Sequence, residues 1–205
     1  MNQRTYSAII FDLGNVLIPF DYTPAINNLN KIQTGLGDKF AEYYKSNYKF
    51  HRDFEKGDIP ENTFINKVLE VVDNKIDAEK FCKLYSDIFT LNEEVIDLLP
   101  ILKKNYKLFL LSNTNSIHQK YGWQKYEFLK YFDKLILSHE VGAVKPEEKI
   151  YRAVEEASGF PSAKHFYIDD IQEYVDTAKK FGWDAVQFVD YQTLLNDFKE
   201  RKILK

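Results

Sequence analysis

The stretch SAIIFDLGNV, residues 7–16, decides the fold. Its apolar half, residues 7–11, has none of the polar alternation of a half-exposed strand, which is typical of a strand covered by helices on both faces. Four more short apolar runs share this character, at residues 108–111, 135–137, 166–168 and 185–189. Helical patterns separate the later runs. This β-then-α rhythm predicts an α/β fold with a Rossmann-like, doubly wound parallel sheet.

Helices are expected at residues 93–105, 146–158, 173–181 and 191–201, because each carries an apolar stripe at helical spacing. Roughly one hundred residues separate the first two strands, whereas a crossover requires only about a dozen or more. Residues 20–90 are helical in pattern and rich in aromatic side chains. We therefore expect a small α-helical cap there, joined by hinges near Pro19 and Leu91 to a core of residues 1–19 and 91–205.

Composition points to one globular body with an appendage. The 205 residues are 44% hydrophobic and 29% charged, with a formal net charge of -3 and no basic stretch, which disfavours nucleic acid as a partner. Residues 1–6 are polar and Asp12 interrupts the apolar run that follows, so we expect no membrane segment and a cytoplasmic protein. Cys82 is the single cysteine, which excludes an internal disulfide.

Polar residues follow four of the predicted strands, at the edge where parallel sheets bind ligands. They are Asp12-Leu13-Gly14-Asn15, Ser112-Asn113-Thr114-Asn115, Lys145-Pro146 and Asp169-Asp170. Singly, each has an ordinary interpretation as a helix cap, a loop or a solvated charge. Four such groups, each at its own strand end, indicate a reactive site.

These residue types suit phosphoryl transfer. A carboxylate such as Asp12 can attack phosphorus and form an aspartyl-phosphate, but the phosphate dianion repels it, so cations are required. Mg²⁺ typically takes one or two carboxylates, a demand that Asp12 and one of Asp169 or Asp170 would meet. Lys145 would supply further positive charge, and the Ser112 hydroxyl with nearby backbone N–H groups would hold the phosphate oxygens.

The four groups, in this order, resemble the motifs of the haloacid dehalogenase superfamily across nearly the whole chain. Within it, the sequence is most similar to the branch of bacterial α-D-glucose-1-phosphate phosphatases and the phosphatase domain of soluble epoxide hydrolase. Phe50-His51 and the following Glu55-Lys56-Gly57-Asp58-Ile59 resemble the helical cap of that branch.

The resemblance implies Mg²⁺-dependent hydrolysis of a small phosphate monoester, with a sugar phosphate such as glucose 1-phosphate as the expected substrate. It implies Asp12, Lys145 and Ser112 as catalytic residues. The expected metal ligands are the side chains of Asp12 and Asp170 and the carbonyl of Gly14, with Asp169 in support. Ser112, Asn113, Thr114, Lys145 and His51 are the expected contacts to phosphate and substrate.

Two positions depart from the superfamily pattern. Gly14 stands where most of its phosphatases carry a second Asp that protonates the leaving group, a contribution usually worth about 10²- to 10⁴-fold in rate. Asp21, His51 or a metal-linked water are the candidates to replace it. Tyr174 stands where relatives usually have an Asn or Asp that supports the metal site; alternatively it only covers the site.

Two other functions compete with the phosphatase. A haloacid dehalogenase would attack carbon through Asp12, but it needs no metal, and two further carboxylates would repel an anionic substrate. A non-catalytic protein that binds phosphorylated ligands would be consistent with Gly14 and Tyr174. The sequence does not choose a substrate; a monomer or weak homodimer is expected.

Overall fold

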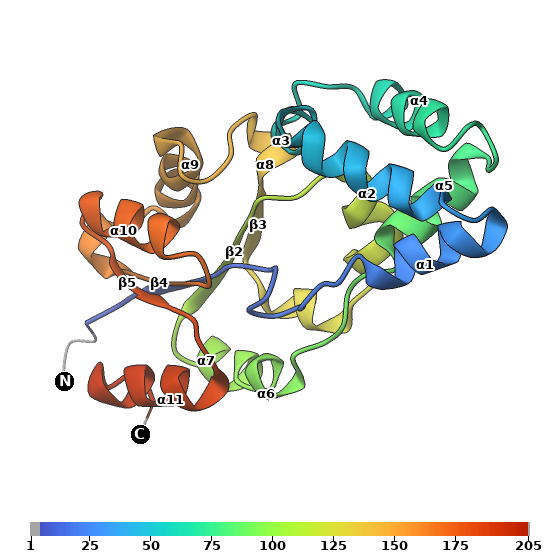
Figure 1. The fold of residues 1–205 in the computed structure, drawn as a ribbon. Helices are drawn as coiled ribbons and strands as arrows, with labels where there is room; N and C mark the ends of the chain where they lie inside the picture. The colour runs from blue at the N-terminus through green and yellow to red at the C-terminus, as the bar shows by residue number, and fades with distance from the viewer. Residues whose placement is uncertain (1–4, 205) are drawn as a thin grey trace.

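The computed structural model describes residues 5–204, and its centre is a five-stranded parallel sheet (Figure 1). The strands are β1 (Ala8–Phe11), β2 (Lys107–Ser112), β3 (Lys134–Leu137), β4 (His165–Asp169) and β5 (Asp184–Gln187). Their order across the sheet is β3-β2-β1-β4-β5. The predicted doubly wound α/β fold and its five strands are therefore confirmed.

The strand order reverses direction at β1, which places the first motif at the centre of the sheet. Phe11 is in register with Leu110 on one side and with Ile168 on the other. All strands are parallel, so the residues that follow β1, β2 and β4 emerge at one edge. This is the position at which open α/β sheets bind their ligands.

Alternate residues of β1 supply two separate hydrophobic cores. Ile9 and Phe11 face the layer of α6 (Glu93–Ile96), α7 (Leu99–Lys103) and α11 (Tyr191–Glu200). Ala8 and Ile10 face the layer of α9 (Glu148–Ser158) and α10 (Gln172–Lys180). Figure 1 shows these helices on opposite faces of the sheet. Both faces are covered, which explains why the strands are apolar without alternation.

The prediction of one continuous helix at residues 93–105 is wrong. The structure has two short helices there, α6 and α7, with a break at residues 97–98. Pro100 lies in the first turn of α7. Proline has no N–H to donate to the carbonyl four residues earlier, and its ring crowds that carbonyl, so a helix ends before it.

Five of the helices between β1 and β2 pack around a hydrophobic cluster of their own, and we call them the cap helices. They are α1 (Thr23–Ile32), α2 (Leu36–Ser46), α3 (Tyr48–Lys56), α4 (Glu61–Val71) and α5 (Ala78–Ser86). Their apolar faces enclose a separate cluster in which the rings of Phe54 and Phe64 stack 4.1 Å apart and Cys82 is buried. In Figure 1 these helices lie together beside the sheet, beyond its reactive edge.

The two chain segments that enter and leave these helices run side by side. Asp21 N donates to Ile88 O and Thr90 N donates to Pro19 O, both at 2.9 Å. The division of the chain into a core and a cap of residues 20–90 stays a prediction.

The segments that flank β3 were not predicted. A π-helix, η1 (His118–Trp123), and a 3-10 helix, η2 (Glu127–Tyr131), precede this strand, and α8 (Ser138–Val141) follows it. Another 3-10 turn, η3 (Ser162–Lys164), precedes β4. Ile117, at the start of η1, packs into the hydrophobic cluster of the cap helices. η1 therefore links the core to the cap helices.

None of the helices in residues 5–204 has the length and apolar character needed to cross a bilayer. Residues 1–6 were expected to hold no membrane segment because they are polar. Of these, residues 1–4 lie outside the part of the chain that the structure describes. The cytoplasmic location stays a prediction.

Candidate active site

A buried ion-pair cluster forms where β1 and β4 end. Lys145 Nζ lies 2.8 Å from Asp12 Oδ1 and 2.6 Å from Asp169 Oδ2. The side chains of Asp12, Lys145 and Asp169 are all at least 92% buried, although they come from three separate motifs. The structure thus brings together three of the residues expected to act in one site.

Asp169 and Asp170 hold different positions although they are neighbours in sequence. Asp169 accepts hydrogen bonds from Lys145 Nζ, the Tyr167 hydroxyl and the backbone N–H of Ile171. Asp170 is half-buried and accepts one hydrogen bond, from Asn15 Nδ2 at 3.1 Å. Asp169 is therefore occupied in holding Lys145, whereas Asp170 has oxygen lone pairs left for a cation.

The arrangement fits a divalent metal. One carboxylate oxygen each from Asp12, Asp169 and Asp170 lie within 4.8 Å of one another. Asp12 Oδ1 is buried and, among residues 5–204, accepts no hydrogen bond of good geometry, despite its proximity to the Lys145 ammonium. Three carboxylates close to the Lys145 ammonium leave an excess of negative charge, which suits Mg²⁺ with its preference for hard oxygen ligands.

The pKa values reflect this crowding. Burial raises the pKa of Asp12 above its usual range, and the nearby Lys145 ammonium opposes the rise without cancelling it. For Lys145 burial acts in the opposite sense, but Asp12 and Asp169 more than compensate and hold its pKa above the ordinary value. Lys145 is thus charged, and an additional cation would favour the ionised form of Asp12 that acts as a nucleophile.

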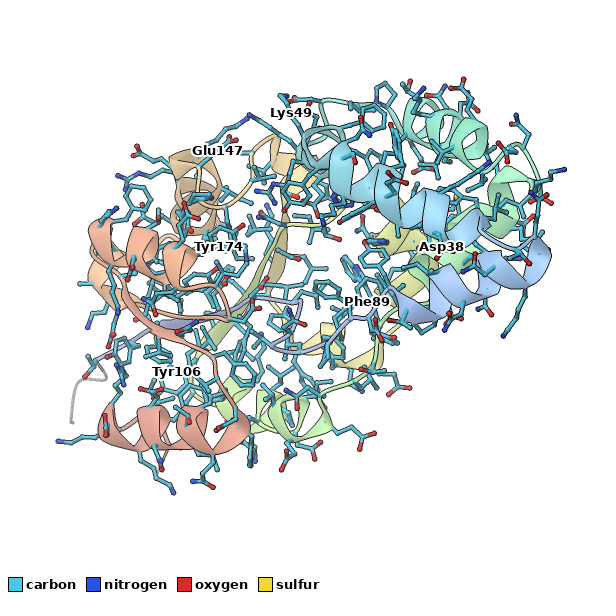
Figure 2. The ribbon with its side chains drawn as sticks, in the orientation of Figure 1. Asp38, Lys49, Phe89, Tyr106, Glu147 and Tyr174 are labelled. Carbon is cyan, nitrogen blue, oxygen red and sulfur yellow. The ribbon has the colours of Figure 1, made fainter. Side chains whose placement is uncertain are left out.

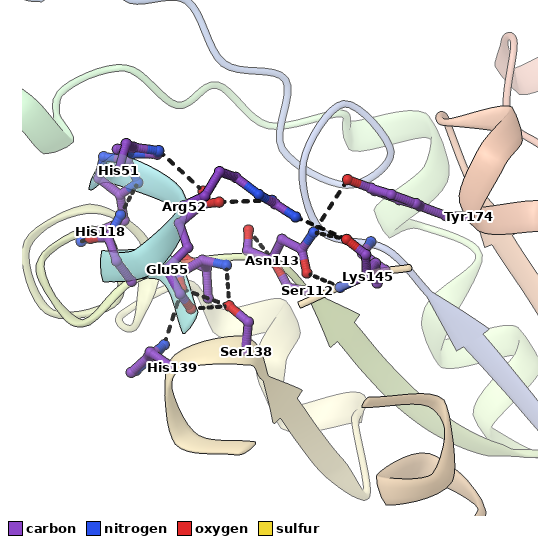
Figure 3. Close-up of polar contacts among 12 residues, drawn as sticks. His51, Arg52, Glu55, Ser112, Asn113, His118, Ser138, His139, Lys145 and Tyr174 are labelled. Carbon is purple, nitrogen blue, oxygen red and sulfur yellow. Dashed lines mark hydrogen bonds and ion pairs between the residues drawn. The ribbon is translucent and has the colours of Figure 1, made fainter. Parts of the chain in front are cut away.

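The side chain of Asn113 positions Lys145. Lys145 N donates to Asn113 Oδ1 at 2.7 Å, and Asn113 Nδ2 donates to Lys145 O at 3.2 Å (Figure 3). Because both ends of the amide are engaged by the backbone, this side chain does not present itself to a phosphate. The contact between Asn113 and the phosphate stays a prediction, with the backbone N–H of Asn113 as the group that could make it.

Tyr174 covers Lys145. Its ring centroid lies 5.1 Å from Lys145 Nζ, and its hydroxyl accepts a hydrogen bond from Asn113 Nδ2 at 3.4 Å. Figure 2 shows Tyr174 on the sheet side of the molecule, at α10. Tyr174 therefore contacts the lysine through its aromatic face, an arrangement that favours the cation.

Ser112, the last residue of β2, and Thr114, two residues later, line a cavity of about 90 Å³ between the sheet edge and the cap helices. The Ser112 hydroxyl is 3.5 Å from the Asn113 carbonyl, a weak contact that leaves it able to donate to a ligand. The backbone N–H of Thr114 is already engaged by Ser138 Oγ at 2.9 Å. Ser112 is therefore better placed than Thr114 to hold a phosphate oxygen.

His51 does not reach this cavity. Both of its ring nitrogens are engaged within the cap helices, with the Tyr44 hydroxyl at 3.2 Å and the Tyr85 hydroxyl at 2.7 Å. Burial, followed by the nearby Arg52 charge, lowers the pKa of His51 to about 3. Both nitrogens are thus paired inside the cap helices in this structure, and a contact between His51 and the substrate stays a prediction.

The structure also accounts for the glycine at position 14. A Cβ added to Gly14 would lie 3.2 Å from Cε1 of Phe20, so an aspartate there would require the ring to move. Asp21, one candidate replacement, is exposed and accepts a hydrogen bond from Thr23 N at 2.8 Å, which lowers the pKa of Asp21. Neither Asp21 nor His51 lines the cavity in this structure.

Two charged side chains of α3 that were not singled out do reach the site. Arg52 Nη2 donates to Lys145 O at 2.9 Å, and Arg52 Nη1 donates to Glu55 Oε2 at 2.9 Å (Figure 3). Glu55 lines the cavity together with Ser112. Burial raises the pKa of Glu55, and the Arg52 charge limits the rise. The sequence resemblance covered both His51 and Glu55. It gave no sign that Glu55, rather than His51, would line the cavity.

The backbone of α3 is held against the core next to these side chains. Ser138 Oγ lies 2.6 Å from Glu55 O and 2.8 Å from Thr114 O. Gly57, with φ of 84°, ends the helix so close to α8 that an added Cβ would lie 2.6 Å from His139 O. Glycine is thus required for the close approach that brings Glu55 to the cavity.

A family model for haloacid dehalogenase-like hydrolases matches residues 6–182. The chain belongs to this family. It is a haloacid dehalogenase-like hydrolase, and the curated proteins that it resembles include phosphatases. D-ribitol-5-phosphate phosphatase of Bacteroides thetaiotaomicron is 24% identical over 187 residues, covering 87% of this chain and 90% of that protein. The phosphorylated carbohydrates phosphatase of Thermotoga maritima is 25% identical over 202 residues, covering 94% and 88%.

Solved structures of the family share the fold. A haloacid dehalogenase-like enzyme of Bacteroides thetaiotaomicron, in complex with magnesium and inorganic phosphate, superposes with a TM-score of 0.79 at 28% identity, covering 92% of this chain and 98% of that one. The L-2-haloacid dehalogenase of Xanthobacter autotrophicus gives a TM-score of 0.64 at 17% identity, covering 98% and 85%, which shows a common fold alone.

Proposed function

We propose that this hydrolase removes phosphate from a small, hydroxylated phosphate monoester through an aspartyl-phosphate on Asp12, with Mg²⁺ as its cofactor. The observation that carries the proposal is the cluster of three carboxylates at the sheet edge, two of which contact the Lys145 ammonium. Such a site repels an anionic substrate unless a cation is bound. This favours a metal-dependent phosphatase over a metal-independent dehalogenase.

Each residue has a task in this reaction. An oxygen of Asp12 attacks phosphorus while the bond to the ester oxygen breaks, and Lys145 and Ser112 hold the phosphate oxygens. Asp169 keeps Lys145 in place. Mg²⁺, held by Asp12, Asp170 and the carbonyl of Gly14, would offset the repulsion between nucleophile and phosphate.

The size of the cavity favours a short leaving group. Its volume of about 90 Å³ is small beside the ~300–1,000 Å³ of pockets for drug-sized ligands. The relatives named for ribitol 5-phosphate and phosphorylated carbohydrates point to the same class. A similar protein of Escherichia coli is a pyrimidine 5'-nucleotidase, 26% identical over 161 residues. We favour a polyol or sugar phosphate, with glucose 1-phosphate one member of that class, over a nucleotide.

Phosphate release is expected to depend on the metal. With Mg²⁺, the purified protein should release phosphate from ribitol 5-phosphate or glucose 1-phosphate more readily than from a pyrimidine nucleotide. EDTA should abolish the release, and excess Mg²⁺ should restore it, since the carboxylate cluster needs the cation. Phosphate and chloride release are measured in parallel, with L-2-chloropropionate as the dehalogenase substrate.

The other outcomes identify the competing functions. Chloride release that persists in EDTA would indicate a dehalogenase. Tight binding of the phosphate esters, without turnover of any of them, would indicate a protein that binds phosphorylated ligands without hydrolysing them.

Glu55 is the group that we propose as the general acid in place of the missing aspartate. It lines the cavity, and burial raises its pKa, so that a protonated fraction persists at higher pH than for an ordinary glutamate. The protonated carboxyl would give its proton to the departing ester oxygen, and the carboxylate would then take a proton from the water that hydrolyses the aspartyl-phosphate. As pH rises through the raised pKa, the first step should slow.

The Glu55→Gln variant is expected to show a strong dependence on the leaving group. Its kcat/KM for ribitol 5-phosphate should fall by about 10²- to 10⁴-fold. Its kcat/KM for p-nitrophenyl phosphate should fall much less, because a nitrophenolate leaves without a proton. Slow hydrolysis of the aspartyl-phosphate should also produce a burst of nitrophenolate.

A matched control is Glu61→Gln, in which the changed carboxylate contacts Ser116 rather than the cavity. In Glu61→Gln, kcat/KM should change by the same small factor for ribitol 5-phosphate and for p-nitrophenyl phosphate. Equal losses for the two esters in Glu55→Gln would contradict the proposed acid role and leave Glu55 with a structural one.

A further inference from the structure

The cavity that Ser112 and Glu55 line is also bordered by residues to which the reaction described above assigns no role, and we call this part of it the chamber. The chamber is walled by aromatic side chains of the segment between β1 and α1, of the segment after α5 and of the π-helix. They are Phe20, Tyr22, Phe89, His118 and Trp123. Figure 2 shows Phe89 between the sheet and the cap helices. The chamber therefore lies where the alcohol part of a bound ester would be.

The protonation of His118 is fixed by its neighbour Asn115. The backbone N–H of His118 donates to Asn115 Oδ1 at 2.9 Å, which orients the amide group. Asn115 Nδ2 is then the atom that lies 3.2 Å from His118 Nδ1. Since an amide nitrogen can only donate, Nδ1 accepts and the ring proton is on Nε2. Burial lowers the pKa of His118 to about 3, so the ring is neutral.

His118 and Trp123 each carry a buried donor that is not used. Within residues 5–204, neither His118 Nε2 nor Trp123 Nε1 has a hydrogen-bond partner, although both side chains are at least 94% buried. The Tyr85 carbonyl is near enough to influence His118 but makes no hydrogen bond of good geometry with Nε2. Leaving a buried donor unpaired is costly, and such groups need an explanation.

The His118 ring has little freedom to find another partner. It stacks on Tyr85 with centroids 4.2 Å apart and meets Phe89 edge-on at 5.3 Å. Trp123 is packed in the hydrophobic core below the sheet edge. The two donors are therefore presented by rigid rings on the same π-helix, and the chamber is the space next to them.

We propose that His118 and Trp123 form a hydroxyl-binding subsite, in which their two ring N–H groups donate hydrogen bonds to oxygen atoms of a short polyol or sugar. The subsite rests on the proposed phosphatase function, since it binds the alcohol part of the ester. It makes the enzyme select hydroxylated esters, because an alkyl chain would leave both donors unpaired. The aromatic walls would contact the carbon atoms of the same ligand.

The test compares ribitol 5-phosphate with n-pentyl phosphate, which has the same number of carbon atoms and no hydroxyl groups. In the wild type, kcat/KM should favour ribitol 5-phosphate. In His118→Phe, which keeps an aromatic ring but removes the N–H, this preference should fall by about 5- to 150-fold, mainly through a higher KM for ribitol 5-phosphate. His165→Phe is the matched control: this buried histidine stacks on Trp183 in the core, away from the chamber, and the preference should persist.

A second measurement needs no change to His118 and no turnover. In the Mg²⁺-loaded wild type, or in Asp12→Asn if hydrolysis is too fast, the indole N–H resonance of Trp123 should move on addition of ribitol 5-phosphate but not of n-pentyl phosphate. The other tryptophan, Trp183, already donates to Glu155 Oε1 at 2.9 Å and serves as an internal reference. A Trp123→Phe variant assigns the signal.

The outcomes separate the two proposals. If neither ester releases phosphate, the phosphatase proposal fails, and the Trp123 resonance alone decides the subsite. Equal kcat/KM for the two esters in the wild type, equal losses for both in His118→Phe, or a Trp123 resonance that ignores ribitol 5-phosphate would each overturn the subsite.

Discussion

The Asp12→Asn variant is expected to lose about 10⁴- to 10⁶-fold in kcat toward ribitol 5-phosphate, the largest effect among the predictions made for this chain. The amide has the size of the carboxylate but no nucleophilic oxygen of comparable strength, so the aspartyl-phosphate cannot form. Phosphate release under saturating substrate and Mg²⁺ measures the effect.

The fold of this variant should survive. In the metal-free protein, three carboxylates lie close together, the Lys145 ammonium contacts two of them, and burial already disfavours the ionised form of Asp12. Replacing this carboxylate by an amide removes one source of like-charge repulsion, while Lys145 keeps its ion pair with Asp169 at 2.6 Å. The melting temperature without metal should therefore be equal to or above that of the wild type.

An exposed acid-to-amide change is the matched control. Asp176 lies on the solvent side of α10. Within residues 5–204, its side chain accepts a hydrogen bond only from Gln172. Asp176→Asn should keep its activity within about twofold, as for surface changes generally. More than a few per cent of wild-type turnover in Asp12→Asn would mean that another group attacks the phosphorus.

The sheet and its reactive edge could be predicted from local sequence. An apolar run such as residues 7–11 must be covered on both faces, and parallel strands deliver the residues after them to one edge. For this reason we expected one site to contain Asp12, Lys145 and Asp169. The structure brings them together, although Asp12 and Asp169 are more than a hundred residues apart in sequence. Helix breaks were less predictable; Pro100 divides a stretch whose apolar pattern is continuous.

The contacts between the cap helices and the core could not be predicted in the same way. His51 and Glu55 are one helical turn apart, and only the packing of α3 against α8 decides which of them reaches the cavity. The amide of Asn113 has the chemistry of a phosphate ligand, yet the backbone of Lys145 occupies it. Such choices depend on tertiary contacts rather than on residue type.

The second large effect is expected for Lys145→Met. Lys145 is fully buried and, among residues 5–204, is the one ammonium in contact with Asp12 and Asp169. Methionine fills similar space but leaves two carboxylates buried without a counter-charge, which typically costs about 3–5 kcal/mol in the free energy of unfolding. Loss of the charge that holds the phosphate oxygens should lower kcat by about 10²- to 10³-fold as well. Urea unfolding without metal and phosphate release with Mg²⁺ measure the two effects.

Lys149→Met is the matched control, because Lys149 lies on the exposed side of α9 and, within the described part of the chain, donates only to the Gly142 carbonyl at 3.2 Å. This surface change should alter the free energy of unfolding by no more than about 0.5 kcal/mol. If Lys145→Met were as stable as Lys149→Met, the carboxylates would not be ionised in the metal-free protein, and the electrostatic basis of the site would be wrong.

The double variant Lys145→Met/Asp169→Asn separates stability from catalysis. Removing the Asp169 charge as well takes away one of the two carboxylates that Lys145 neutralises, so the double variant should lose less stability than the sum of the single changes. Activity should not recover, because the phosphate still lacks its ammonium. A double variant that regained turnover would show that Lys145 acts only through the charge balance of the buried cluster, and not on the substrate.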